Sequence, residues 1–409
     1  MLLAAGSNAH GQLSNATLED SRSFSPCCFF GCSPGTLPVN RRLVHLAFGA
    51  NHTLALLESH KSPEEITTEL WGCGDGKCGQ LGPSHNSDNT STLKPLHLSL
   101  ERIGLAEYYP RLVAACWETT FVVLSRQDMP DVLISMGAND FGDLGVGKYE
   151  GKMSARDVHV VRLDHLSPGV IPGCSDSFLV QSLAAGQHHV VAKLKTASGD
   201  LIVGWGTSRH GQLGDTDKPF TSSPISISTG RPDDAIISTA VGHQHTVFLH
   251  SSGTVSGLGS NKKRQLDGVP TLARAKSVNC TWNGTYITTM DADVWDLLSV
   301  GSNANGQLGR ADSDRTNLGR VEFPFTSRTH RLLQVACGSE HVLASFVVES
   351  SSTTEVWGWG WNEHGNLGLG TTEDIRAPAK IWPSEDPATP LQGEVSIWAG
   401  AGTSWIVVQ

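Results

Sequence analysis

Short apolar runs separated by turn residues recur along the whole chain. Residues 43–47, 53–57 and 69–71 form one such series, and a glycine-containing turn follows it. Runs of three to five residues with turn glycines between them are typical of antiparallel hairpins. The pattern therefore predicts an all-β chain in which each repeating unit holds about four short strands.

A glycine motif follows each series of runs. It consists of a glycine, four residues, a second glycine, a polar residue and a leucine, as in residues 206–213. The fifth copy carries Arg264 in place of the second glycine. Seven copies are present, and they end at Leu13, Leu81, Leu144, Leu213, Leu266, Leu308 and Leu367. Because the motif is constant while the spacing between copies varies, the sequence predicts a repeat array with variable connections.

A second motif alternates with the first. It is a small residue, a glycine, two further residues and a histidine that leads into an apolar run. The clear copies end at His52, His189, His245 and His341. Three further copies deviate from this pattern. In two of them we place tryptophan at the glycine position and threonine at the histidine position. In the last copy Gly402 takes the glycine position and Trp405 the histidine position. The two substituted pairs are Trp117 with Thr120 and Trp282 with Thr285.

Four short strands cannot bury a core alone, whereas seven sheets stacked around an axis can, so we predict a seven-bladed β-propeller. The chain begins with a glycine motif and ends after a second motif. We therefore expect one domain, residues 1–409, in which residues 1–13 pair with the C-terminal blade at 393–409. This closure would remove two exposed sheet edges. The expected long loops are 14–40, 83–108, 148–178 and 371–393.

Composition argues against several classes of function and indicates the cellular compartment. The formal net charge of −10 argues against a broad phosphate-binding surface, so we expect no direct nucleic-acid binding. No apolar run approaches 18 residues and residues 1–6 lack a basic leader, so we expect no membrane association. The nine cysteines form no obvious disulfide framework, which favours a reducing compartment. We expect a cytoplasmic protein, and the nucleus remains open as a second location.

No set of residues in the sequence has the spacing of a catalytic or metal centre. The four motif histidines occur once per repeat, so we expect each to form a hydrogen bond with a neighbouring turn. Cys27, Cys28 and Cys32, and Cys73 with Cys78, lack the paired spacing of a zinc ribbon. The glycine-rich residues 74–79 lie between predicted strands and not before a helix. We therefore expect no catalytic residue, no metal and no cofactor, which indicates that the protein is not an enzyme.

Tryptophan is the most distinctive residue type that remains. Trp71, Trp205, Trp357 and Trp359 recur at or near the glycine motif, which predicts packing between blades. Trp117, Trp282, Trp361 and Trp405 depart from the repeat. Because aromatic residues are enriched at binding surfaces, these four are candidate contacts for a partner.

The alternating motifs cover nearly the whole chain and resemble the seven-bladed propellers of the regulator of chromosome condensation family. The resemblance implies the propeller fold and raises guanine nucleotide exchange on a small GTPase as one activity. The plant ultraviolet photoreceptors, which are tryptophan-rich propellers, repeat a Gly-Trp-Arg-His-Thr element. Here Trp117 is followed by Glu118 and Trp282 by Asn283, which argues against photoreception.

Residues 72–75, 115–120, 357–366 and 402–407 are similar to the propeller-only fungal family of α-tubulin suppressors, also called killer-toxin-insensitivity proteins. This resemblance implies a non-enzymatic partner of a small zinc-binding electron carrier of the CSL type. The pair would act in diphthamide synthesis on elongation factor two and in Elongator-dependent modification of the tRNA wobble uridine, with contacts to Elongator or the diphthamide enzymes. Nucleotide exchange and a tubulin or ubiquitin-pathway scaffold remain alternatives. The implied partner-binding residues are Trp117, Glu118, Trp282, Trp361, Glu363, His364 and Trp405.

Overall fold

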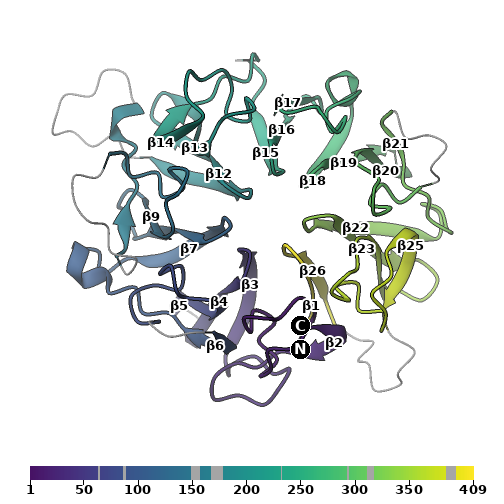
Figure 1. Cartoon of the computed structure of the whole chain (residues 1–409), viewed down its shortest axis with the longest axis horizontal. Coiled ribbons are helices and arrows are strands. Elements are labelled where there is room, and N and C mark those ends of the chain that lie inside the picture. The colour runs from purple at the N-terminus through teal and green to yellow at the C-terminus, as the bar shows by residue number, and fades with distance from the viewer. Residues whose placement is uncertain are drawn as a thin grey trace.

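Seven antiparallel sheets surround one axis in the computed structural model, which confirms the predicted all-β seven-bladed propeller (Figure 1). The structure describes residues 1–62, 65–85, 89–148, 157–166, 178–231, 233–292, 294–310, 317–383 and 393–409. Within these ranges six sheets have four strands and one has three. None of the helices in the described ranges has both the length and the apolar character needed to cross a bilayer.

We number the blades from the one that contains both termini and list their strands outward from the axis. Blade 1 holds β26 (Val395–Ala399), β27 (Thr403–Val408), β1 (Leu2–Gly6) and β2 (Ser21–Pro26). Blade 2 holds β3 (Arg41–Phe48), β4 (His52–Ser62), β5 (Glu65–Gly74) and β6 (Thr90–Pro95). Blade 3 holds β7 (Tyr109–Ala115), β8 (Thr119–Ser125), β9 (Val132–Gly137) and β10 (His159–Val160). Blade 4 holds β11 (Leu179–Ala185), β12 (His189–Thr196), β13 (Gly199–Thr207) and β14 (Phe220–Ser226).

The remaining blades follow the same order. Blade 5 holds β15 (Ile236–Val241), β16 (His245–His250) and β17 (Val255–Gly259), and the short helix η3 (Val269–Thr271) packs near β17. Blade 6 holds β18 (Ala275–Thr281), β19 (Gly284–Asp291), β20 (Val294–Gly301) and β21 (Gly319–Arg320). Blade 7 holds β22 (His330–Cys337), β23 (His341–Val348), β24 (Thr354–Gly360) and β25 (Ile375–Trp382). Two further short helices are η1 (Leu100–Ile103) and η2 (Asp164–Leu166).

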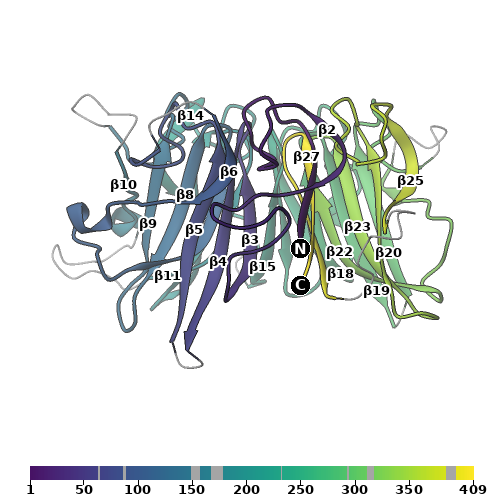
Figure 2. The same ribbon diagram turned by 90° about the horizontal axis from the view of Figure 1, so that it is seen from below.

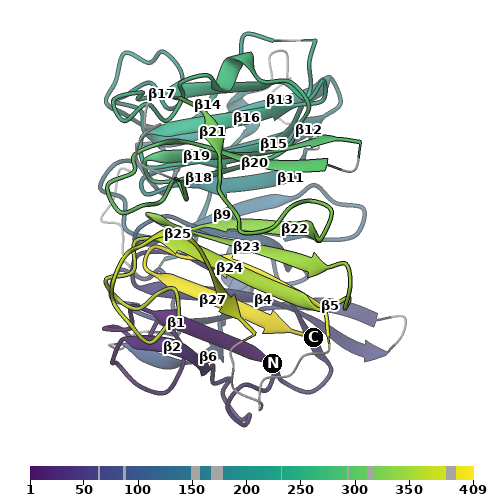
Figure 3. The same cartoon turned by 90° about the vertical axis from the view of Figure 1, so that its right-hand side faces the viewer.

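The two ends of the chain close the ring. Strand β1 lies between β27 and β2, with Leu2 opposite Val407 and Leu3 opposite Ile406. All five residues of β1 are buried, and the two termini lie side by side (Figure 3). The predicted pairing of the N-terminal strand with the C-terminal blade is confirmed.

The antiparallel order puts two kinds of connection on the same face of the propeller. Turns between the first and second strands, and the loops between the third and fourth strands that carry the glycine motif, form what we call the glycine-motif face. The β4–β5 hairpin extends beyond the opposite face (Figure 2). The segments expected as long loops are more regular than predicted, because they contain the outer strands β2, β6, β10 and β25. Residues 149–156 and 167–177, most of the expected loop 148–178, lie outside the described residues.

The glycine motif is a turn that packs one blade against the next. Gly11 has φ +83°, and a Cβ at this position would lie 2.7 Å from the Cα of Ser91 in β6 of the next blade. Glycine is the residue that tolerates both constraints. Arg264, in the fifth copy, still adopts φ +64°, so the degenerate copy keeps the same turn.

The second motif is also explained by packing. A Cβ on Gly49 would lie 2.1 Å from Cε1 of the His52 ring, so the imidazole lies directly over the glycine of its own turn. The backbone N–H of Gly49 donates to the carbonyl of His52 and sets the turn. Glycine and histidine therefore occur together because the ring needs the space that a side chain would fill.

The hydrogen bond that joins the glycine place to the histidine place defines the register of each turn. It shows that the register predicted from the sequence was wrong in three blades. In blade 3 the bond joins Cys116 to Thr119, and in blade 1 it joins Gly400 to Thr403. In blade 6 Thr281 is paired with Gly284. Trp117 and Trp282 thus lie one residue after the glycine place, and Thr120, Thr285 and Trp405 do not occupy the histidine place. Without a histidine ring above it, the glycine position accepts Cys116 or Thr281.

Each motif histidine joins two blades. His52 Nε2 lies 3.0 Å from Oγ1 of Thr120, and His189 Nε2 lies 3.1 Å from Oγ1 of Thr246. His245 and His341 make equivalent 3.1 Å contacts with Thr285 and Ser404. The prediction of a structural hydrogen bond is confirmed, although the partner is a hydroxyl on the second strand of the next blade and not a turn. Burial lowers the pKa to about 4 for His52, His245 and His341 and to about 3 for His189, so these rings are neutral.

Candidate partner-binding face

Two tryptophans meet at the axis on the glycine-motif face. The rings of Trp117, from blade 3, and Trp282, from blade 6, have centroids 5.7 Å apart and are half-buried. Each is the residue after the glycine place of its turn. At this position the other blades have smaller or more polar residues, namely Ala50, Gln187, His243, Ser339 and Ala401. The register correction therefore moves both tryptophans by one residue, from the glycine place to the next position of the turn, on this face.

Backbone hydrogen bonds between blades hold these turns in place. The N–H of Ala50 donates to the carbonyl of Trp117, whose own N–H donates to the carbonyl of Gln187. On the other side of the axis His243 donates to Trp282, and Trp282 donates to Ser339, at 3.0 and 2.7 Å. Because neighbouring blades fix both turns, the aromatic pair is preorganised, which lowers the entropic cost of binding.

A cavity of about 240 Å³ lies along the axis next to the pair, and all seven innermost strands or their turns contribute to its wall. Three cysteines line it: Cys116, Cys280 and Cys337. Burial raises the pKa of Cys280 to about 12 and raises the pKa values of Cys116 and Cys337 well above the ordinary thiol value. These groups are protonated thiols, which are poor nucleophiles and poor metal ligands.

Charge is unevenly distributed over the face. On blades 2 and 3 the carboxylates of Glu118, Asp75 and Asp140 all lie near Cys78. Together with burial, which has the largest effect, they raise the pKa of its thiol. On blades 4 and 5 the loops carry Arg209, Lys262, Lys263 and Arg264. The face therefore has an acidic side and a basic side despite the net negative charge of the chain.

Trp361, Glu363 and His364 lie on the loop after β24, on the same face. The Trp361 ring is half-buried, 5.3 Å from the His364 ring, and its Nε1 donates to Glu363 at 3.3 Å. His364 Nδ1 lies 2.7 Å from a carboxylate oxygen of Asp20 in the next blade. Six of the seven predicted partner-binding residues are thus on one face: Trp117, Glu118, Trp282, Trp361, Glu363 and His364.

The seventh residue, Trp405, is not on the surface, so its assignment as a partner contact was wrong. Its side chain in β27 has no exposed surface, packs against Phe48 at 5.6 Å and donates from Nε1 to Oγ1 of Thr403. The error follows from the register of the last motif copy. Since Thr403 occupies the histidine place, Trp405 is an ordinary residue of the apolar strand that follows.

Replacing Trp405 by alanine should lower the free energy of unfolding by about 3–5 kcal/mol, because it leaves a large cavity in the closing blade. Trp361→Ala, at a half-buried position, should cost much less. Urea unfolding followed by far-ultraviolet circular dichroism measures both changes. Equal losses from the two substitutions would contradict the assignment of Trp405 to the core.

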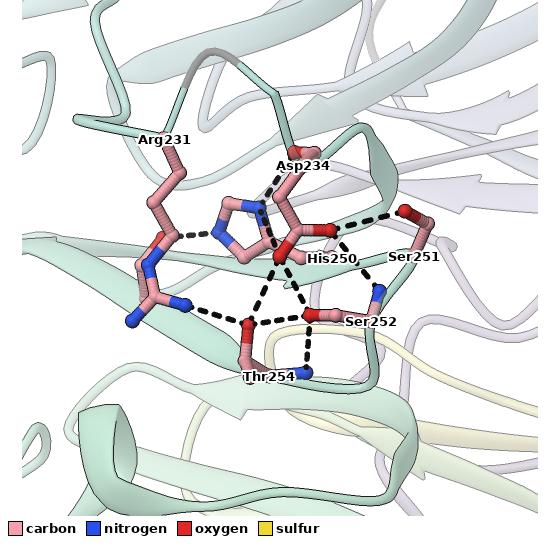
Figure 4. A network of polar contacts seen from close by, with 7 residues as sticks. Arg231, Asp234, His250, Ser251, Ser252 and Thr254 are labelled. Atoms are coloured by element: carbon pink, nitrogen blue, oxygen red, sulfur yellow. Dashed lines mark hydrogen bonds and ion pairs between the residues drawn. The ribbon is translucent and has the colours of Figure 1, made fainter.

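A polar network on the face opposite the glycine motif was not predicted from the sequence (Figure 4). His250 is fully buried, with Nε2 2.7 Å from Oγ of Ser256 and Nδ1 3.0 Å from the backbone carbonyl of Asp234. The carbonyl fixes the proton on Nδ1, so Nε2 accepts from the serine. This Asp-His-Ser order resembles a hydrolase triad, and the residues come from separate strands and loops, so no sequence spacing could have shown it.

The contacts of the Asp234 carboxylate favour a structural role for the network. It accepts hydrogen bonds from the hydroxyls of Ser251, Ser252 and Thr254, at 3.0, 2.6 and 3.2 Å, and lies 3.9 Å from His250 Nδ1. The Ser252 hydroxyl is the main cause that lowers the pKa of Asp234 to about 2. The carboxylate therefore holds the β16–β17 turn and does not orient the imidazole.

A metal centre is not apparent in the described residues, where no three His, Cys, Asp or Glu side chains gather closely enough to hold an ion. Burial raises the pKa values of Cys27 and Cys73, the latter being hydrogen-bonded to a backbone carbonyl of the glycine motif. Both thiols belong to the core between blades 1 and 2.

The RCC1 repeat, named for the regulator of chromosome condensation, matches residues 43–80, 296–345 and 355–397. Among curated relatives, the Ultraviolet-B receptor of Arabidopsis thaliana is 29% identical over 98% of this chain and 82% of the receptor. An RCC1 repeat-containing protein of Schizosaccharomyces pombe is 27% identical over 100% of this chain and 99% of its own length. The secretion-regulating guanine nucleotide exchange factor of Bos taurus is 26% identical over 93% of this chain and 78% of the factor.

Solved structures agree on the fold. Human WBSCR16 superposes with a TM-score of 0.70 at 19% identity, covering 100% of this chain and 98% of that protein. Prp20p from Saccharomyces cerevisiae gives a TM-score of 0.71 at 18% identity, covering 99% and 90%. The chain is a seven-bladed propeller that carries repeats similar to the RCC1 repeat. Its relatives include proteins named as guanine nucleotide exchange factors and one named as an Ultraviolet-B receptor, although the Gly-Trp-Arg-His-Thr element is absent here.

Proposed function

We propose that this chain is a non-enzymatic docking propeller that captures another protein on its glycine-motif face. The observation that carries the proposal is the half-buried Trp117–Trp282 pair, held over the axis by hydrogen-bonded turns. Tryptophans in rigid, partly desolvated positions are the residues that contribute most to protein interfaces. Glu118, Trp361, Glu363 and His364 would extend the contact toward blades 3 and 7.

The partner we propose is a small zinc-binding electron carrier, with the complex acting in diphthamide synthesis and in Elongator-dependent wobble-uridine modification in the cytoplasm. Support comes from the resemblance of residues 115–120 and 357–366 to the fungal propeller family. The half-buried Glu118 and exposed Glu363 beside the tryptophans would suit basic groups on such a partner.

Trp117→Ala and Trp282→Ala should each weaken capture of the zinc-loaded carrier about thirtyfold or more, since a truncated hot-spot residue typically costs about 2 kcal/mol or more. Isothermal titration calorimetry measures the affinity, and circular dichroism melting checks the fold. Leu333→Ala, an exposed position in the middle of the innermost strand of blade 7, is the matched control. Failure of the native protein to bind the carrier at micromolar concentration would remove this partner.

A second candidate is guanine nucleotide exchange on a small GTPase. It is favoured by the relatives named as exchange factors and by the yeast structure, which is described together with its binding to Gsp1p and histones. The test is release of a fluorescent GDP analogue from purified small GTPases. Unchanged release rates with a stoichiometric excess of the propeller would dispose of this activity.

A further inference from the structure

A second recess opens on the glycine-motif face, beside the tryptophan pair. It is a pocket of about 160 Å³ between loops of blades 3, 4 and 5. Its wall includes two phenylalanines, Phe141 and Phe220, which are 39% and 41% exposed. The wall also includes Arg209 and the imidazoles of His188, His210 and His243. We call these six residues the imidazole pocket.

Contacts hold two of the imidazoles, His188 and His243, and join them to the tryptophans. The His188 ring lies 4.6 Å from the Phe141 ring, and its Nδ1 lies 3.3 Å from a carboxylate oxygen of Asp143. The His243 ring lies 5.9 Å from Trp282, and the His188 ring lies 6.5 Å from Trp117. The pocket and the aromatic pair therefore form one continuous surface.

The charges around the pocket favour an anion. Arg209 and Lys262 are exposed, and both lie close enough to His210 to lower its pKa in addition to the larger effect of burial. Burial, followed by His188 and His210, lowers the pKa of His243. Asp143 is the acidic group that faces His188, and it is almost fully buried. Near neutral pH the pocket therefore presents the uncharged imidazoles of His210 and His243 beside two exposed cations.

We propose that the imidazole pocket recognises a carboxylate side chain and an adjoining apolar side chain in an acidic peptide segment of the docked partner. The inference rests on the proposed docking function and specifies the chemistry of its partner. A carboxylate can accept hydrogen bonds from the Arg209 guanidinium and from protonated imidazoles. Phe141 and Phe220 provide exposed apolar walls for the neighbouring side chain.

Binding should be coupled to proton uptake. An incoming carboxylate stabilises the charged form of nearby imidazoles, so the pKa values of His210 and His243 rise in the complex. By linkage the affinity must then increase as the pH falls from 7.5 to 6.0. Apart from His210, which faces His243, the groups facing these two rings are Arg209, Lys262 and His188, none of which is a carboxylate that would already have paired with them.

The test uses a fluorescein-labelled peptide of alternating glutamate and phenylalanine, with fluorescence anisotropy of the full-length protein at pH 7.5 and 6.0. We expect the glutamine version of the peptide to bind at least tenfold more weakly. Arg209→Gln should reduce binding at both pH values. The double variant His210→Gln, His243→Gln should lose the increase in peptide affinity between pH 7.5 and 6.0. Arg328→Gln and His60→Gln, near the opposite face, are the matched controls.

The inference would be overturned if the two peptides bound equally well or if Arg209→Gln bound the acidic peptide as tightly as the native protein. It would also be overturned if the affinity of the double histidine variant still increased on acidification. Failure of the imidazole pocket can be distinguished from failure of the proposed docking function. If capture of the carrier depends on Trp117 and Trp282 but the acidic peptide does not bind, only the imidazole pocket loses its role. If the peptide binds while no carrier is captured, the pocket stands and a different partner is required.

Discussion

Deletion of residues 1–6 is expected to open the propeller and to lower the free energy of unfolding by more than about 4 kcal/mol. Strand β1 is buried on both faces and pairs with β27 on one side and β2 on the other. Its loss removes two core leucines, each of which contributes about 1.5–3 kcal/mol, and detaches β2 from the blade. The exposed edge of β27 should also promote aggregation.

Urea unfolding followed by tryptophan fluorescence measures this effect, with static light scattering to detect association. A matched pair of point substitutions separates closure from a general effect of mutating the N-terminal segment. Ala4→Asp places a charge at a position with no exposed surface, whereas Leu18→Asp alters a side chain that is 49% exposed. If the deletion left the urea midpoint unchanged, or if Leu18→Asp were as harmful as Ala4→Asp, the closing role of β1 would be refuted.

Acidification should destabilise the fold strongly below pH 6.5, because four buried histidines must remain neutral. In the unfolded chain these rings take up protons near pH 6.5, whereas in the folded state they do so only near pH 4, and near pH 3 for His189. The unfolded state therefore binds more protons in this window, and stability falls with falling pH. Each histidine contributes a slope of up to about 1.4 kcal/mol per pH unit, and the four together several kcal/mol by pH 4.5.

Urea unfolding measured from pH 7.5 to 4.5 checks this expectation. His189→Gln replaces the ring with an amide that does not titrate and can still contact Thr246, so it should lower stability at pH 7.5 but flatten the pH dependence. His60→Gln, at an exposed position, is the matched control. A pH profile that is the same in both variants would show that the buried rings do not control acid unfolding.

Repeat number and closure could be predicted from the sequence because they depend on local chemistry. Each blade needs its own turn, and the turn of the glycine motif requires a positive φ at positions such as Gly11. Seven copies therefore indicated seven sheets. The unmatched motifs at the two ends of the chain indicated that β1 would complete the last blade, because an unpaired edge strand is unfavourable. The outer strands were harder to predict, since β10 and β21 span only two residues each.

The candidate binding face could be predicted only in part. Sequence alone identified Trp117, Trp282 and Trp361 as departures from the repeat, but it could not distinguish them from Trp405, since a shift of one or two residues in register decides between surface and core. That register is set by the hydrogen bond across each turn, which the sequence pattern does not show. The imidazole pocket was not predicted, because its residues come from three different blades.

The sequence by itself thus determined the number of blades, the turn in each and the pairing of the two ends, because these follow from backbone geometry within one repeat. The tertiary structure alone decided which aromatic and charged side chains meet. Trp117 and Trp282 are distant in the chain and contact each other only because the ring brings blades 3 and 6 together across the axis. Contacts of that kind depend on how the blades are placed around the axis, and no local pattern encodes that placement.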